Sequence, residues 1–389
     1  FSLIFRSIFS FIGLLTLLST IYDLRNMKLQ TGKWLFTSFS VYTNTKKLFT
    51  FKSNPDNLSC LDGIRSIAML WIIIGHTFST QLIVLPVNPL DVIDVISLLK
   101  NIHLFYLNRI LRMFPILATA VLLQASLLNH MTDGPYWGIV TKSVHDCQHY
   151  WWTTLLYVHN LCIAHSWYLA IDMQLYIISP IVLFWVLSGN KRSAWAALVG
   201  SLLAVLAGAT VYNFIMEFQS TAISAKGRNY YTKNYYINTL PRSSPFFVGM
   251  LFGYILHLFR GKRVRLSKVT VTLLWLIATV TTTTIVVAHY FIIQPDWNNQ
   301  TIDSILNSFM RPAWAAGVAW LVFACTHGYG GPINWFLSLH MFKFLGRLSY
   351  AMYVFHLPLI YLINSTAVAP NYFSVEFSVS TNTKVQRTF

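Results

Sequence analysis

Uncharged apolar runs of nearly membrane-spanning length recur along this sequence and limit what it can fold into. A helix needs about 20 apolar residues to cross the hydrocarbon core of a bilayer. The runs lack the strict alternation of polar and apolar residues found in membrane β-barrel strands. The sequence therefore predicts an all-α, polytopic transmembrane helix bundle with about nine visible spans. These spans are residues 7–22, 66–87, 113–130, 173–189, 193–216, 243–259, 269–293, 312–327 and 348–363.

The charged residues are few and mostly basic. Only 10% of residues are charged, against about a quarter in soluble domains, so they cannot coat a water-facing surface. The 28 Lys and Arg residues exceed the 12 Asp and Glu residues, which gives a net charge of +16. In a soluble protein this excess would indicate nucleic acid, whereas in a membrane protein it collects in cytoplasmic loops. We therefore expect a membrane as partner and no nucleic acid.

Loop charge assigns the sides of the membrane. Basic residues gather in 23–65 and 260–268, which we expect to be cytoplasmic. The segments 131–166 and 294–311 are expected to be luminal or extracellular, and the second contains the glycosylation sequon NQT at 299–301. The sequence thus predicts a multi-pass glycoprotein of the endoplasmic reticulum or plasma membrane.

One stretch breaks the alternation of sides. A crossing is required between about residues 88 and 105, but this stretch contains two Asp and one Lys and is too short in apolar residues to supply it. We therefore expect no full transmembrane helix there. Since residue 1 is also Phe and not Met, the chain is expected to be incomplete.

Arg65 and His76 occupy a single apolar span. They are eleven residues apart, or about 16 Å along a helix, which places Arg65 near the cytoplasmic face and His76 about halfway through the bilayer. An ionisable side chain at that depth is costly and is functional by default. The alternative is a histidine that holds helices together through hydrogen bonds.

Further charged residues could take part in chemistry. Arg109 and Arg112 are three residues apart, on one helical face before a span, and could bind the phosphates of a nucleotide-linked cofactor or serve as a cytoplasmic anchor. Asp172, close to Gln174, interrupts an apolar run near its luminal end. Its carboxylate could orient an imidazole or bind a hydroxylated acceptor, or it could face the lumen or pair with an arginine such as Arg242.

Two of the four cysteines lie in one segment on the expected oxidising side. Cys147 and Cys162 bracket a short aromatic stretch, so we expect a disulfide between them. Cys60 and Cys325 are expected to be free thiols.

The histidines do not predict a metal site. The segment that contains the cysteine pair has no helical i, i+4 ligand pair with a supporting carboxylate, so no metal is expected. His356, in a later apolar span, is interpreted as a packing or helix-bridging residue. The histidines of the cysteine segment are His145, His149, His159 and His165.

Several long motifs together resemble a known family. In chain order they are LDGIRSIAMLWIIIGH, RILRMFP, WYLAIDMQLYIISP, PRSSPFFVGMLFGYIL and GRLSYAMYVFH. This arrangement resembles the acyltransferase-3 family of multi-pass membrane acyltransferases, and in particular its nose-resistant-to-fluoxetine-like branch. The resemblance covers nearly the whole chain. We expect a first span with a basic cytoplasmic loop at 1–57, an acyltransferase-3-like membrane domain at 58–375 and a polar tail at 376–389.

The resemblance also implies a reaction. The family moves an acyl group from cytoplasmic acyl-coenzyme A, a co-substrate and not a bound cofactor, to a hydroxyl of a lipid, sugar or small molecule at or across the membrane. Arg65 and His76 correspond to the essential pair of the family. Arg109 and Arg112 correspond to its basic motif, which we expect to hold the coenzyme A phosphates, and Asp172 corresponds to an acidic position. The expected catalytic residues are therefore His76, Arg65 and Asp172.

The other class of function that the sequence allows is a non-catalytic transporter or a lipid- or drug-handling membrane protein. In that class the intramembrane polar groups would line a path. Inverted repeats and broken helices in matching positions would favour it, and none is visible in the sequence. Basic groups on one face and a buried base favour the acyltransferase.

Overall fold

The computed structural model is helical throughout the residues that it describes, and these contain no strand, which confirms the predicted all-α class. The described residues are 2–26, 34–50, 58–78, 102–126, 128, 137–158, 162–188, 190–220, 228–262, 264–294 and 297–365. Its helices are α1 (Ser2–Asn26), α2 (Trp34–Thr37), α3 (Val41–Phe49), α4 (Ser59–Phe78), α6 (Ile102–Ser126), α7 (Trp137–Leu155), η2 (Ala164–Ser166), α8 (Trp167–Val186), α9 (Lys191–Met216), α10 (Arg228–Tyr231), the π-helix η3 (Thr232–Tyr236), α11 (Thr239–Leu258), α12 (Lys268–Ile292), α13 (Gln300–Thr326), α14 (Gly331–Leu337) and α15 (His340–Ser365).

Six of the described helices are long and apolar enough to cross a membrane, namely α1, α6, α8, α9, α12 and α13. The three other expected spans are not among these six. Residues 243–259 and 348–363 fall in the helices α11 and α15, and the described part of 66–87 falls in α4. The chain is thus a helical membrane protein with several crossings.

Helix α6 begins well before the start that the sequence predicted. It starts at Ile102 instead of residue 113, so Arg109 and Arg112 lie inside a candidate span and not in front of it. The carboxylate of Asp172 pairs with Arg109, which removes much of the cost of a charge at this position. Residues 88–101 lie outside the described part, so the absence of a full crossing there stays a prediction.

The segment 131–166 was expected to be a loop, but it contains the 19-residue helix α7. Val144, Cys147 and Thr154 are buried, and their spacing of three and seven residues places them on one face of a helix. His145, His149 and Tyr150, which lie between them in the sequence, are exposed. The expectation of a loop was wrong because a half-polar amphipathic helix lacks a long apolar run.

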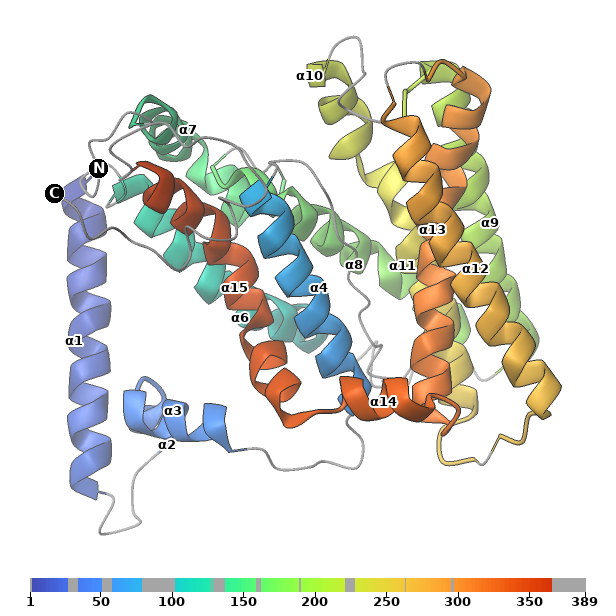
Figure 1. The fold of residues 1–389 in the computed structure, drawn as a ribbon. Helices are drawn as coiled ribbons and strands as arrows, with labels where there is room; N and C mark the ends of the chain where they lie inside the picture. The colour runs from blue at the N-terminus through green and yellow to red at the C-terminus, as the bar shows by residue number, and fades with distance from the viewer. Residues whose placement is uncertain are drawn as a thin grey trace, which may run out of the picture. The chain divides into compact units, whose positions relative to one another are not determined.

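The described helices group into two compact units, which are taken in turn. The first contains α1 to α4, the second half of α6, α7 and α15. Here the Ser40 and Thr43 hydroxyls donate to the Asp23 carboxylate and fasten α3 to α1. Arg347 of α15 donates to the carbonyl oxygens of Leu48 (2.7 Å) and of two neighbouring residues at the end of α3. Helix α15 also packs along α4 (Figure 1).

The second unit contains the first half of α6 and the helices α8 to α14. Figure 1 shows α9, α11, α12 and α13 side by side, as their contacts also indicate. The core between α8, α9 and α11 is formed by large apolar side chains, among them Leu175, Leu198 and Phe247. Gly317 allows close approach of α12 and α13, because a Cβ atom there would lie 2.8 Å from the Thr282 side chain.

Candidate functional site

Arg65 lies at the point where α4 meets α15. Its Nη1 atom is 3.9 Å from Oδ1 of Asp62, one helical turn earlier. The buried Ser66 hydroxyl hydrogen-bonds to the carbonyl oxygen of Phe342 on α15 at 3.0 Å. Gly346 brings the backbones together, since a Cβ atom there would be 3.2 Å from Cα of Asp62. The turn that contains Arg65 is therefore held in place by packing between the helices.

His76 lies eleven residues further along the same helix. At 1.5 Å per residue, the two backbone positions are about 16 Å apart, as the sequence predicted. The His76 side chain lies outside the described part of the structure. Its expected catalytic role therefore stays a prediction.

Asp172 forms a buried ion pair with Arg109. Its carboxylate Oδ2 accepts from Nη2 of Arg109, and the two side chains are 8% and 14% exposed. The Arg109 guanidinium also lies 4.8 Å from the centroid of the Tyr176 ring. Among the alternatives for Asp172, pairing with an arginine is thus the one observed, although the partner is Arg109 and not Arg242.

Aromatic contacts on both sides of this pair fix how α6 and α8 run against each other. The rings of Phe105 and Tyr176 stack with centroids 4.3 Å apart. The Tyr176 hydroxyl donates to the Phe105 carbonyl oxygen at 3.2 Å, and the Tyr106 hydroxyl donates to that of Ile177 at 3.1 Å. The two helices are antiparallel here, because residues further along α6 meet residues earlier in α8.

The register bears on which arginine can meet a cytoplasmic ligand. Asp172 is about 7.5 Å from the start of α8 and about 21 Å from its end at 1.5 Å per residue. If segment 131–166 is non-cytoplasmic, Arg109 lies far from the cytoplasmic end of α8. Two expectations, a non-cytoplasmic 131–166 and an Arg109 that holds the phosphates of cytoplasmic acyl-coenzyme A, do not fit this register together. Arg112, one turn beyond Arg109, is exposed.

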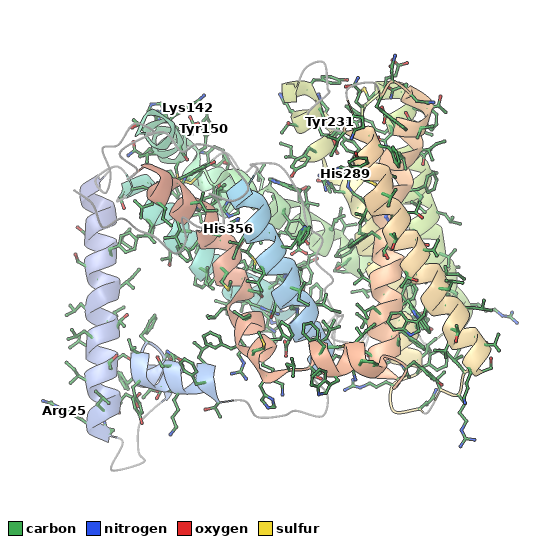
Figure 2. All side chains as sticks on the ribbon, viewed as in Figure 1. Arg25, Lys142, Tyr150, Tyr231, His289 and His356 are labelled. Carbon is green, nitrogen blue, oxygen red and sulfur yellow. A yellow bond between two sulfur atoms is a disulfide. The ribbon has the colours of Figure 1, made fainter. Side chains whose placement is uncertain are left out.

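A histidine pair in the first unit was not assigned a site from the sequence. His165 of η2 and His356 of α15 are both 5% exposed, and their rings meet edge to face with centroids 4.7 Å apart. Nε2 of His165 and Nδ1 of His356 each donate to the Tyr353 carbonyl oxygen at 2.7 Å. When neutral, His356 therefore has its proton-accepting lone pair on Nε2. Figure 2 labels His356, whose contacts fit the expected helix-bridging role.

The predicted disulfide between Cys147 and Cys162 is confirmed. It joins α7 to the segment before η2. The side-chain amide of Gln124 on α6 donates to the Cys162 carbonyl oxygen at 2.8 Å and to the Ser143 hydroxyl at 2.6 Å. The disulfide-linked segment is therefore also fastened to α6. Cys60 and Cys325, which were expected to stay outside the disulfide, do so, and both are buried.

Because α7 is a helix, His145 and His149 form an i, i+4 pair, which the sequence interpretation had not identified. Their rings are 4.3 Å apart, between centroids, and both residues are exposed. Within the described ranges, no group of three or more His, Cys, Asp or Glu side chains could hold a metal ion. His159 lies outside those ranges.

A comparison with known families decides the class of the protein. The acyltransferase domain family matches residues 95–381, which is most of the chain. The chain belongs to the acyltransferase-3 family. Together with its candidate spans, this membership makes it a multi-pass membrane protein of an acyltransferase family. The matched region contains Arg109, Arg112 and Asp172 and begins after His76, so the correspondence of Arg65 and His76 depends on the motif that contains them.

Two nematode proteins are similar to this acyltransferase-3 member. Nose resistant to fluoxetine protein 6 of Caenorhabditis elegans is 25% identical over 87% of the chain and 49% of its own length. Regulator of hypoxia-inducible factor 1 of the same organism is 22% identical over 85% of the chain and 76% of its own length. The chain thus spans about half the length of the first relative. No solved structure matches it.

Proposed function

We propose that this chain transfers an acyl group from acyl-coenzyme A to a hydroxyl of a lipid, sugar or small molecule at or across the membrane. The observation that carries the proposal is the acyltransferase family match over residues 95–381. The Arg65 and His76 motif, on a helix packed along α15, supplies an ionisable pair of the kind that this reaction needs. The protein would work in the endoplasmic reticulum or plasma membrane, with its 299–301 sequon on the non-cytoplasmic side.

In this proposal His76 is the general base. Neutral imidazole takes the proton of the acceptor hydroxyl while the hydroxyl oxygen attacks the thioester carbonyl carbon. The carbon–sulfur bond then breaks, and the departing coenzyme A thiolate receives the proton from the imidazolium. The products are an acyl ester and free coenzyme A. Burial of His76 in an apolar span would favour the neutral form that can accept a proton.

The arginines divide between two roles. The Arg65 side chain is 33% exposed, so its guanidinium can meet a coenzyme A phosphate beside Asp62, which lies 3.9 Å away. Arg109, by contrast, is committed to Asp172, and the pair is better suited to positioning α6 against α8. We therefore propose Arg65 as the donor-binding residue, and Arg109 and Asp172 as positioning residues. Arg112, one turn beyond Arg109, lies further still from the cytoplasmic end of α8.

The experiment is an acyl-transfer assay with membranes that contain the full protein. Labelled acetyl- and longer acyl-coenzymes A would be added, and lipids, glycans and small molecules would be separated for label. The proposal expects ester-linked label that is absent from membranes without the protein. An Arg65→Gln variant should raise KM for the acyl donor more than it lowers kcat. If no label is transferred while a lipid or drug accumulates across the membrane, the chain is a transporter and the proposal is wrong.

A further inference from the structure

Two arginines from different helices share one aromatic cluster in the second unit. Arg242 lies in the first turn of α11 and Arg311 lies in α13. The Cζ atom of Arg242 is 5.0 Å from the centroid of the Trp167 ring and 4.6 Å from that of Tyr236. The Cζ atom of Arg311 is 4.6 Å from the centroid of the Tyr235 ring. Neighbouring residues of η3 thus place both guanidiniums in one cluster.

The cluster contains no negative charge among the described residues. The ion pairs found among the described residues involve other arginines, Arg65 and Arg109. The positive charges of Arg242 and Arg311 repel each other. Burial raises the pKa of Tyr231 and of Tyr236, so neither phenol becomes an anion at neutral pH. A buried guanidinium beside a second positive charge is unfavourable without a counter-charge. The arrangement is therefore stabilised by any anion that reaches it.

The arginine donors are already partly aligned for such an anion. Nε of Arg242 donates to the Tyr236 carbonyl oxygen at 2.9 Å, whereas its buried Nη2 makes no hydrogen bond to the described residues. Nη1 of Arg311 donates to the Tyr235 hydroxyl, which in turn donates to the Asn307 carbonyl oxygen at 3.0 Å. The aromatic rings cover guanidinium faces and leave the in-plane edges for oxygen acceptors.

The cluster lies towards one end of the helix bundle. Figure 2 shows Tyr231 at the end where α10 lies. The ring of Phe218, just after α9, packs against that of Tyr235 with centroids 5.3 Å apart. The Phe218 carbonyl oxygen accepts a hydrogen bond of 3.1 Å from the side-chain amide of Gln300, at the start of α13. The sequon at 299–301 therefore lies at the same end. A ligand would reach the cluster from the side that loop charge assigns as non-cytoplasmic.

We propose that Arg242 and Arg311 bind the phosphate group of a lipid headgroup or of a small molecule. A phosphate monoester has a charge of about −1.5 to −2 at neutral pH, which matches two guanidiniums. Its oxygens fit the planar donor edge of arginine. Trp167, Tyr235 and Tyr236 form the walls of the site. The site does not depend on the proposed acyl transfer and can be tested without it.

The test measures thermal unfolding of the purified full chain in an uncharged detergent. One arm titrates sodium phosphate against sodium chloride of equal ionic strength, and the other adds phosphatidic acid or phosphatidylcholine to the micelles. A ligand that binds the folded state raises the unfolding midpoint with its concentration. Arg242→Gln and Arg311→Gln should each weaken this binding about ten- to hundredfold, the equivalent of one charge-assisted hydrogen bond. The control is Arg192→Gln, at an exposed position of α9 in the same unit.

The outcomes separate the two sources of phosphate. A rise with both probes means that free phosphate is sufficient, and a rise with phosphatidic acid alone identifies a lipid headgroup. The proposal is overturned if neither probe raises the unfolding midpoint above that of its chloride or phosphatidylcholine control. It is also overturned if Arg192→Gln weakens binding as much as Arg242→Gln and Arg311→Gln do. If Arg242→Gln does not fold, Arg242→Lys keeps the charge but loses the planar fork. That variant should bind about tenfold more weakly, and unchanged affinity would contradict the site.

Discussion

Removing one member of the Arg109–Asp172 ion pair should destabilise the protein strongly. Both side chains are less than 15% exposed, at 14% and 8%, so the surviving charge stays buried without its partner. Breaking a buried pair in this way costs about 3–5 kcal/mol, whereas an exposed pair contributes about 0–1 kcal/mol. Arg109→Gln also loses the contact with the Tyr176 ring, which contributes about 0.5–2 kcal/mol. We therefore expect Arg109→Gln and Asp172→Asn each to lower stability by several kcal/mol.

A double-mutant cycle measures the interaction directly. The double variant carries two neutral amide side chains, and it should be less damaged than the sum of the single changes by about 1–3 kcal/mol. The assay measures unfolding in detergent, with the chemical accessibility of buried cysteines as the readout. Arg112→Gln, three residues along the same helix but exposed, is the matched control and should change stability by about 0.5 kcal/mol or less. Additive single changes, or an Arg112→Gln effect as large as that of Arg109→Gln, would refute this account of the pair.

Three further changes test other parts of the structure. Cys147→Ser should lower stability by about 3 kcal/mol, measured by unfolding without reductant, and reductant should abolish the difference from the unchanged protein. Thr301→Ala should remove a glycosidase-sensitive mass shift, whereas Thr301→Ser should keep it. Both variants keep Asn299, whose side chain caps α13, so loss of the shift would not reflect unfolding of this helix. Gly346→Ala should lower the free energy of unfolding by about 1–3 kcal/mol, because the added methyl group overpacks α4 against α15. Gly200→Ala, which has open space around it, should instead stabilise α9 by about 0.5–1 kcal/mol. Equal effects of the two changes in an unfolding assay would contradict the close approach of α4 and α15.

Features that depend on local sequence could be predicted. The length of the apolar runs was sufficient for the all-α class and for the positions of most long helices. Cys147 and Cys162 lie in one short segment that loop charge assigns to the oxidising side, so their pairing could be predicted without knowledge of the fold. Helix α7 was missed because its buried face is formed by small or half-polar residues and not by a continuous apolar run.

Features that depend on helix register could not be predicted. Asp172 is 63 residues from Arg109, and its partner is decided by how α6 and α8 are aligned. His165 and Tyr353 are 188 residues apart, so nothing in either segment indicates the other. Sequence alone could show that a charge in an apolar span needs a partner, but not which residue supplies it.

The central claim is that His76 is the base of an acyl transfer, and the most direct measurement compares transfer rates of His76→Ala with the unchanged protein. Loss of a general base lowers the rate about 10²- to 10⁴-fold, so we predict a fall of that size with equal amounts of protein in the membrane. His289→Ala, on α12, is the control and should transfer normally. A His76→Ala protein that transfers acyl groups from coenzyme A as fast as the unchanged chain would contradict the account.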